Sequence, residues 1–555
     1  GSGSQTLRAS GADTDLNIDG GNLVLQGKAD TDGAALTYAA LENRGHLTIQ
    51  ASDNAISAFN TTLQVDGATF GSNSTTTFTL NSDGNLTESF IQSSGSIVVE
   101  NGASFHVTTL PGINITWNPG NPMELSLMEL TGTGDITLGD NTLTVGGLFL
   151  TYYKNAHLVH EGNKILLKAE EQTDNPYAIL TDTANSLAGA NLVWGAARSG
   201  QVDQYLTGFL SAINDDLINN PGAVSRKMAA AAGSTVNALG TAQRDALREQ
   251  MGWIRNRTNQ MGVNPAYINE DLPYFHMWME GTGSYAQLDT KGDESGYKLT
   301  TWGGTFGVDV DLSDSFTMGA AFTANYGDLT ASAADTADGH LDSYYANLFG
   351  RYQSKRWAHT LILTGGWNDA KLNRTVDYGA GSYRTEGSTN GWGLGAMYEL
   401  TYDIYLNEDR SSILQPLFNA SVVTTRMDGY RETGAGNAGL SVDKQEWTTG
   451  TLALGGRWMG LVGSNLFGRE ALAELRVNAA QDLGDDRGET AVGFLANPGY
   501  TQQVRGAKVG RTALQIGAGL SVPVGTQGTI FVNGNADIRN GASSLNGSIG
   551  YRYDF

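Results

Sequence analysis

The chain of 555 residues contains no cysteine, and this absence excludes disulfide bonds and thiolate metal sites. Only ten residues are proline, below the usual share of ~5%, whereas 73 are glycine. A backbone with much glycine and little proline can hydrogen-bond continuously, which favours closely packed β-structure over a proline-rich disordered linker. The 34 basic side chains are outnumbered by 57 acidic ones, and this balance disfavours binding to nucleic acid.

The sequence also lacks the runs and motifs that would indicate a helical membrane protein or an enzyme. No segment approaches the ~18 consecutive apolar residues of a transmembrane helix. No Gly-x-Ser-x-Gly, His-Glu-x-x-His or Walker-type motif occurs. We therefore predict neither an enzyme nor a cofactor or metal site. Residues 1–4, Gly-Ser-Gly-Ser, are typical of a cloning remnant, so an export signal removed with the native N-terminus is compatible with the sequence.

Charge and composition change along the chain and indicate three regions. Residues 1–225 carry seven basic and 23 acidic side chains, whereas residues 226–260 carry six basic and two acidic ones. Aromatic residues become frequent beyond this basic stretch. We predict a β-rich head at 5–183, a helical linker at 184–260 and a long β-region at 261–555.

The head repeats short triplets whose first and third residues are apolar, flanked by Gly, Asn or Asp turns. Strands this short cannot form a stable hairpin sheet, but stacked as rungs they place Leu, Ile and Val in one continuous column. The triplets therefore favour a degenerate right-handed parallel β-helix, with a β-sandwich of short strands as the alternative. The clearest triplets are Leu23–Leu25, Leu47–Ile49, Leu63–Val65, Ile97–Val99, Ile136–Leu138 and Leu143–Val145.

The linker region shows helical spacing. From Ala184 onward two sets of apolar residues fall at helical spacing, and the Asn-Asn-Pro-Gly sequence at 219–222 then ends the pattern. The first set is Ala188, Leu192 and Ala196, and the second is Leu206, Phe209, Leu210 and Ile213. A second helix is predicted from Val224 to Asn259, with a basic stripe beside an apolar stripe. The basic stripe consists of Arg226, Arg244, Arg248 and Arg255.

Beyond Leu272, long segments alternate between large apolar residues and small or charged ones, most of them at or above the ~9–11 residues of a tilted transmembrane strand. The strands of a soluble β-sandwich show the same alternation, so only the lengths of the connections can distinguish a sandwich from a transmembrane barrel. Five tight turns alternate with six mostly longer polar loops, which gives twelve strands and an up-and-down transmembrane barrel. The turns lie at 311–314, 353–356, 407–411, 462–469 and 524–528. The longer loops lie at 290–297, 328–340, 369–383, 428–446 and 482–508, and the sixth loop, at 540–543, is short.

The chain ends on an aromatic residue. Ile549, Tyr551, Tyr553 and Phe555 share one face of a strand, and polar residues occupy the other face. This pattern is similar to the signal that outer-membrane barrels present to the barrel-assembly machinery. An edge strand that happens to end in Phe is the alternative interpretation.

Together these features resemble the autotransporter family of type Va secretion. The segments Ala238–Gln243 and Ile254–Thr258 are similar to the linker before the barrel in many members. The resemblance covers essentially the whole chain and implies an all-β protein with a helical linker: a right-handed parallel β-helix passenger, a helix threading the lumen, and a 12-stranded transmembrane β-barrel translocator. It also implies a stabilising, chaperone-like passenger end around Thr144–Trp194.

The function implied by the resemblance is secretion and display of the chain's own passenger at the surface of the bacterial outer membrane. The implied partners are outer-membrane lipid, the barrel-assembly machinery and periplasmic chaperones, with a monomeric state. The alternative is a surface adhesin whose retained head binds host or bacterial surfaces. A porin-like channel is disfavoured by the attached head. Self-cleavage between Asn219 and Asn220, known in some members, is disfavoured because the pair lies far ahead of the barrel.

A helix inside the barrel would need partners on the wall, which every second residue of a strand lines. We predict that arginines of the basic stripe pair with inward-facing carboxylates, so that the helix plugs the pore and anchors the passenger. By alternation the candidate carboxylates are Glu280, Asp309, Glu399, Glu474 and Asp537.

Overall fold

The computed structural model describes residues 67–72, 74–80, 89–109, 122–259, 275–466, 469–525 and 527–555, and the short strand segments 16–18, 41–42, 46–49, 54–57 and 63–65. Two compact units divide the chain: a head unit of residues 1–181, 193–224 and 378–381, and a barrel unit of residues 182–192, 225–377 and 382–555. Residues 1–4, which we interpret as a cloning remnant, and the triplet Leu23–Leu25 lie outside the described residues.

Short parallel strands form three sheets in the head unit. From β3 onward the chain visits the three sheets in strict rotation, which is the pairing pattern of a three-faced parallel β-helix. Parallel pairing in all three sheets argues against the alternative β-sandwich, and the right-handed sense stays a prediction. The first sheet contains β1 (Leu16–Ile18), β3 (His46–Ile49), β6 (Gly67–Phe70), β9 (Ile97–Val99) and β12 (Ile136–Leu138). The second contains β4 (Asn54–Ser57), β7 (Thr75–Leu80), β10 (Ala103–Thr109) and β13 (Asn141–Val145), and the third contains β2 (Leu41–Glu42), β5 (Leu63–Val65), β8 (Ile91–Ser93) and β11 (Met123–Leu130).

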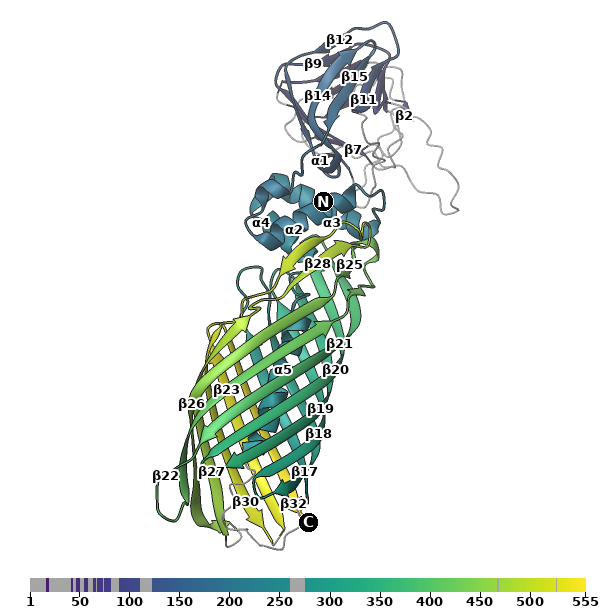
Figure 1. The fold of residues 1–555 in the computed structure, drawn as a ribbon. Coiled ribbons are helices and arrows are strands. Elements are labelled where there is room, and N and C mark those ends of the chain that lie inside the picture. The colour runs from purple at the N-terminus through teal and green to yellow at the C-terminus, as the bar shows by residue number, and fades with distance from the viewer. Residues whose placement is uncertain are drawn as a thin grey trace, which may run out of the picture. The chain divides into compact units, whose positions relative to one another are not determined.

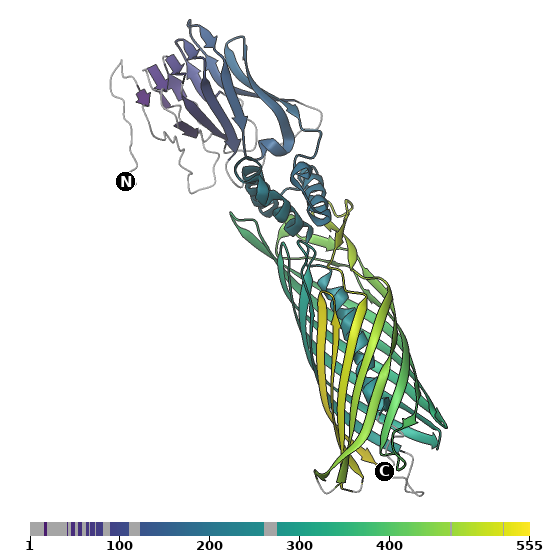
Figure 2. The same cartoon turned by 90° about the vertical axis from the view of Figure 1, so that its left-hand side faces the viewer.

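The stack of strands, seen from the side in Figure 2, encloses an apolar column. Phe70, Phe78 and Phe105 are buried within it, and the ring centroids of Phe70 and Phe105 lie 5.3 Å apart. The third sheet continues into an antiparallel hairpin of β14 (Tyr153–Glu161) and β15 (Lys164–Glu171). This hairpin and the short helix α1 (Phe149–Tyr152) lie in the region expected to be the chaperone-like passenger end. That role stays a prediction.

Four longer helices follow the hairpin: α2 (Ala184–Ala197), α3 (Gln204–Asn219), α4 (Pro221–Ala232) and α5 (Ala238–Asn259). The Asp203 carboxylate caps α3 by accepting the N–H groups of Tyr205 and Leu206. Helix α3 ends at Asn219, as the Asn-Asn-Pro-Gly sequence predicts. Across the described part of the chain, each helix is too short or too polar to cross a membrane.

The single helix predicted from Val224 to Asn259 is wrong, because the structure breaks it into α4 and α5 with a turn at 233–237. Gly233 adopts the left-handed backbone conformation, with φ at +77°. Glycine reaches this conformation without steric cost and commonly ends a helix there. A glycine among small residues looked compatible with a continuous helix, so the sequence pattern hid the break.

The barrel unit closes twelve long antiparallel strands into one sheet. Each long strand pairs with its neighbours along the chain, β21 pairs with β23, and the first strand pairs with the last. The predicted number and order of strands are therefore confirmed. The long strands are β16 (Phe275–Leu288), β17 (Gly296–Ser313), β18 (Phe316–Ser332), β19 (Thr336–Ser354), β20 (Trp357–Asp377), β21 (Ser382–Tyr402), β23 (Ser412–Met427), β26 (Gln445–Leu466), β27 (Arg469–Gly484), β30 (Thr512–Val524), β31 (Gly528–Arg539) and β32 (Ala542–Asp554), and β22 (Ile404–Tyr405) is a short extension at β23.

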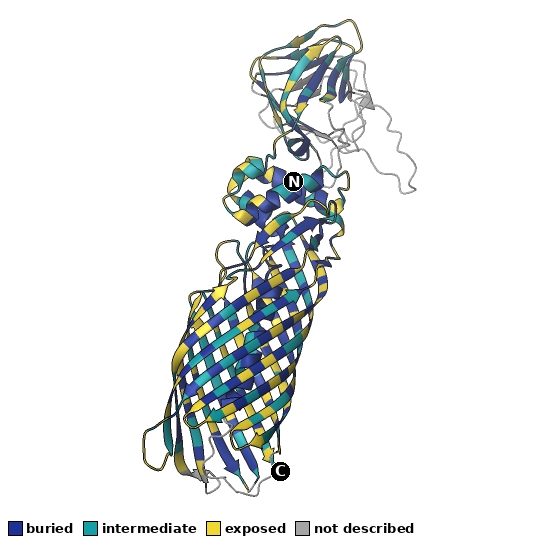
Figure 3. Ribbon diagram, in the orientation of Figure 1, coloured by how far each residue is buried: buried dark blue, intermediate teal, exposed yellow. Residues whose placement is uncertain are grey.

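Burial alternates along the strands, which gives the barrel the chequered pattern of Figure 3. On β21, Trp392 and Leu394 are exposed, whereas Glu399 and Thr401 are buried on the opposite face. A soluble barrel would place the apolar residues inside. Here they point outward, so the outer face suits lipid and the inner face is polar.

Short connections are confirmed between β17 and β18, between β19 and β20, and between β21 and β23, whereas the predicted turns at 462–469 and 524–528 include residues outside the described ranges. Two of the predicted long loops are wrong. Strands β18 and β19 are joined by residues 333–335, and β20 and β21 by residues 378–381. The polar end segments of these four strands were predicted to be loops because of their hydrophilic side chains, but their backbones remain paired with the neighbouring strands. The loops at 428–444 and 485–511 remain long and together form a small antiparallel sheet of β24 (Tyr430–Arg431), β25 (Leu440–Val442), β28 (Glu489–Phe494) and β29 (Gln502–Arg505).

Candidate functional site: the helix-filled lumen

Helix α5 runs inside the barrel (Figure 1), where 18 of its 22 residues are buried. It packs against one side of the wall, formed by β17, β19, β20, β21, β23 and β26. Its apolar stripe of Leu247, Met251 and Ile254 belongs to the same buried cluster as Tyr345 and Phe349 of β19. The helix is therefore held in part by apolar packing against the wall.

Arg244 is almost completely buried near the start of α5. Its guanidinium group donates to the carboxylate of Asp245, the next residue of the helix, at 2.8 and 2.5 Å. The guanidinium carbon also lies 4.4 Å from the ring centroid of Trp447, within the range of a cation–π contact. Arg244 therefore meets none of the predicted wall carboxylates.

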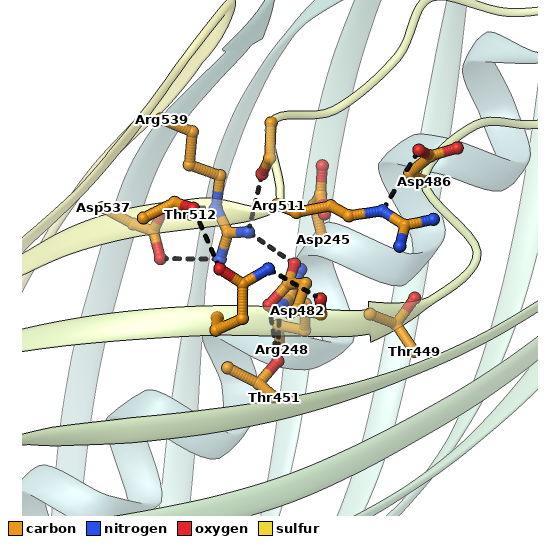
Figure 4. Close-up of polar contacts among 12 residues, drawn as sticks. Asp245, Arg248, Thr449, Thr451, Asp482, Asp486, Arg511, Thr512, Asp537 and Arg539 are labelled. Atoms are coloured by element: carbon orange, nitrogen blue, oxygen red, sulfur yellow. Dashed lines mark hydrogen bonds and ion pairs between the residues drawn. The ribbon is translucent and has the colours of Figure 1, made fainter.

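Arg248 belongs to a charged cluster that joins the helix to β27 and β31 (Figure 4). Its guanidinium group donates to Asp482 and to the Thr451 hydroxyl, each at 2.6 Å. Arg539 donates to the same Asp482 carboxylate and, at 2.6 Å, to Asp537. Asp537 was predicted to meet the helix, but it reaches Arg248 only through this chain of contacts. The direct partner of Arg248 is Asp482. Asp482 was predicted to lie in the loop at 482–508, but it lies near the end of β27.

Arg257 makes the most deeply buried ion pair between helix and wall. One of its terminal nitrogens lies 2.7 and 2.9 Å from the two carboxylate oxygens of Asp309, and both side chains are only 1% exposed. Asp309 was predicted to face the lumen, but Arg257 was missed. On a helical wheel Arg257 falls beside Leu239, away from the basic stripe, so the stripe gave no reason to select it.

The other two arginines of the predicted stripe behave differently. Arg226 lies on α4, not α5, and its side chain is exposed. Arg255 lies on α5 and is 8% exposed, yet it makes no ion pair with any residue that the structure describes. The expected pairing is therefore not found for Arg226 or Arg255 within the described ranges.

The remaining predicted carboxylates are buried but do not pair with the helix. The Glu399 carboxylate lies 3.5 Å from Arg457, and the Glu474 carboxylate lies 3.5 Å from Arg476. One oxygen of Glu280 is buried without a hydrogen-bond partner in the described structure. Some wall carboxylates are thus neutralised by arginines of the wall itself. The alternation of residues along a strand shows which side chains face inward, but not which of them pair with each other.

The turn before α5 has a second set of anchors that the sequence did not indicate. Asp335 accepts hydrogen bonds from the N–H and hydroxyl groups of Thr235. Arg374 donates to both oxygens of Glu432 at 2.8 and 2.7 Å and to the carbonyl of Ala230 at 3.1 Å. Burial raises the pKa of Asp335 to about 6, against the opposing effect of the Arg374 guanidinium. The turn and the end of α4 are thus held by the β18–β19 connection and by β20, where Arg374 also binds Glu432 of the loop at 428–444.

The C-terminal strand presents its apolar residues outward. Ile549, Tyr551, Tyr553 and Phe555 are all exposed on the outer face of the barrel unit. The N–H of Phe555 donates to the carbonyl of Phe275 at 3.0 Å, which extends the pairing between the last strand and the first. The predicted apolar face is therefore present, and its use as an assembly signal stays a prediction.

A closed barrel with a lipid-compatible exterior and a polar, helix-filled interior defines the class of outer-membrane β-barrels. Residues 277–535 match the family model described as "Autotransporter beta-domain". The barrel unit therefore contains an autotransporter β-domain, and this barrel is a translocator domain of the bacterial outer membrane.

Relatives share only parts of the chain. Esterase EstA of Pseudomonas aeruginosa is 31% identical over 211 residues, which are 38% of this chain and 31% of the esterase. An extracellular serine protease of Serratia marcescens is 27% identical over 181 residues, which are 32% of this chain and 16% of the protease. The match thus spans less than a third of either relative. Among solved structures, the translocator domain of the autotransporter NalP from Neisseria meningitidis covers 58% of this chain and all of its own length, at 16% identity and a TM-score of 0.44.

Proposed function

We propose that the barrel unit secretes the head unit across the outer membrane and then displays it at the cell surface, with α5 left in the lumen as plug and anchor. The observation that carries this proposal is the course of α5 through the barrel. Its N-terminal end contacts Gln445 and follows Asn237, which donates to Val504 among the long loops. Its C-terminal end contacts Asp309, close to a tight turn.

This course of α5 supports one orientation of the chain across the membrane. In outer-membrane barrels the short turns face the periplasm and the long loops face the exterior. Residues that precede α5 therefore leave the lumen on the exterior side, where a displayed passenger would lie. A chain that had never crossed the membrane would have to enter the lumen from the opposite rim.

The proposed partners follow from the surfaces. The apolar outer face binds outer-membrane lipid, and the exposed aromatic face of the C-terminal strand is the surface that we propose the barrel-assembly machinery recognises. Periplasmic chaperones would hold such strands before closure, because unpaired strand edges aggregate. Closure within one chain leaves no strand edge for a second copy, so we propose a monomer.

Single-cysteine labelling can test display, because the chain has no cysteine of its own. We would place one cysteine in the head (Thr133→Cys) and, as a matched control, one in a tight turn (Asp314→Cys); both positions are exposed. A membrane-impermeant maleimide added to intact cells should label Thr133→Cys and leave Asp314→Cys unlabelled, whereas permeabilised cells should label both. Labelling of the turn but not the head in intact cells would overturn the proposed orientation.

Adhesion is a second candidate function for the retained head. The second sheet carries a ladder of hydroxyl and imidazole side chains on one face: Thr77, His106 and Thr144 lie opposite one another across three strands. Such a row offers hydrogen-bonding groups to a polar surface ligand. Protease shaving that removes the head from intact cells should then abolish binding to host or bacterial cells, and unchanged binding would exclude this role.

The proposal assigns no enzymatic activity to the residues described. The names esterase and serine protease belong to relatives that match over about a third of this chain and over less than a third of their own lengths. A turnover assay of the purified chain with ester and peptide substrates, alongside an assay of the barrel after removal of the head, would reveal any activity that the sequence motifs fail to indicate.

A further inference from the structure

A cavity of about 130 Å³ remains in the lumen beside α5. A cavity of this size holds several water molecules, since one water needs only roughly 10–15 Å³ by the same kind of measure. The lining combines charged residues of the helix with polar residues of β23, β27, β30 and β31. Among the lining residues are Arg255, Asn419, Arg476, Gln515 and Asn535.

Arg255 is the exceptional member of this lining. It is 8% exposed, and its Nε–H is buried without a hydrogen-bond partner in the part of the chain that the structure describes. The amide nitrogen of Asn419 on the same cavity is also buried without a partner among those residues. Two unused donors, one of them on a full positive charge, therefore line the same space.

The surroundings add further positive charge. Arg476 lines the cavity at 2% exposure and interacts repulsively with Arg255. Arg457, which is completely buried, lies directly opposite Arg476 on the neighbouring strand. Like charges opposite one another on adjacent strands are unfavourable. Glu474 and Glu399 each lie 3.5 Å from one of these two wall arginines, which leaves Arg255 without a counter-charge of its own.

A buried charge without a counter-charge destabilises the folded state. We infer that the cavity binds a small monovalent anion, chloride under ordinary conditions, held between Arg255 and Arg476 with the Asn419 amide as a further donor. Asp245 and Glu249 on the same cavity disfavour an anion of higher charge. The bound anion would neutralise the charge of Arg255, for which the barrel wall provides no carboxylate partner among the residues described.

Crystallography with bromide gives the first test. The whole protein would be crystallised from detergent and soaked in sodium bromide, because bromide replaces chloride and gives an anomalous signal. We expect a peak between Arg255 and Arg476 in the wild type and none in Arg255→Gln, whose neutral amide needs no counter-ion. A wild-type cavity that contains only water, or a peak that persists in Arg255→Gln, would overturn the inference.

The second test measures stability in solution. The unfolding midpoint in detergent would be followed as chloride replaces gluconate at constant ionic strength, so that screening is unchanged. Binding to the folded state raises the midpoint of the wild type, and Arg255→Gln should lose this dependence. Arg384→Gln removes the same charge from an exposed position and should respond like the wild type. Equal chloride responses in all three proteins, or none in the wild type, would contradict a specific site.

Discussion

Replacement of Arg257 by methionine should loosen the helix within the lumen more than loss of any other helix arginine. The substitution keeps much of the side-chain volume but leaves the Asp309 carboxylate buried at 1% exposure without its partner. Removal of one member of a buried ion pair typically costs about 3–5 kcal/mol. At about 1.4 kcal/mol per factor of ten, the equilibrium between docked and undocked helix should shift roughly a hundredfold to several-thousandfold.

Single-channel recording in planar lipid bilayers would detect this shift, because an undocked helix opens the lumen. We expect Arg257→Met to spend far more time in a high-conductance state than the wild type. The pair Arg257→Met with Asp309→Asn removes both charges and should recover most of the closed behaviour, which a double-mutant cycle would quantify. Arg226→Met is the matched control, because Arg226 is exposed on α4 and should leave conductance unchanged.

Two results would refute this reasoning. If Arg257→Met remained as closed as the wild type, the ion pair with Asp309 would not hold the helix in place. If the double variant were as open as the single variant, the effect would come from lost packing and not from the stranded carboxylate.

Three further predictions concern other parts of the chain. Gly233→Ala should lower the free energy of unfolding in detergent by about 1–3 kcal/mol, because φ is +77° and a Cβ would come within 2.6 Å of a leucine side chain. Tyr177→Phe should speed thermolysin cleavage of the head in the whole protein, since the lost hydroxyl leaves the buried side-chain oxygen of Asn214 without its donor, at a cost of about 1–3 kcal/mol. Phe555→Ser should reduce the amount of heat-modifiable barrel in outer membranes several-fold if the C-terminal face is an assembly signal; an unchanged amount would exclude that role.

The sequence was sufficient to predict the barrel, because each strand repeats the same two-residue alternation and each short turn is marked by polar or small residues. The apolar face of Ile549 to Phe555 was predicted for the same local reason. The partner of Arg248 was not predictable, since it depends on the depth of α5 and on the stagger of the strands around the barrel. Asp482 looked like a loop residue, and only the closed sheet brings it beside the helix.

The helical linker shows the same limit at shorter range. Periodicity located α3, and the Asn-Asn-Pro sequence at 219–221 located its end, because these residues disfavour continuation of the helix. It failed at Gly233, because a glycine among alanines is compatible with either a helix or a break. The contacts of Thr235 with Asp335 favour the break, and these residues lie 100 positions apart in the chain.

The pairing of β16 with β32 has a consequence for biosynthesis. The barrel cannot close until β32 has been synthesised. A polypeptide that stops before β32 has two unpaired strand edges, whose backbone N–H and C=O groups cannot be satisfied in the hydrocarbon of the bilayer. Closure of the barrel wall therefore depends on β32, whatever the order in which the other strands pair.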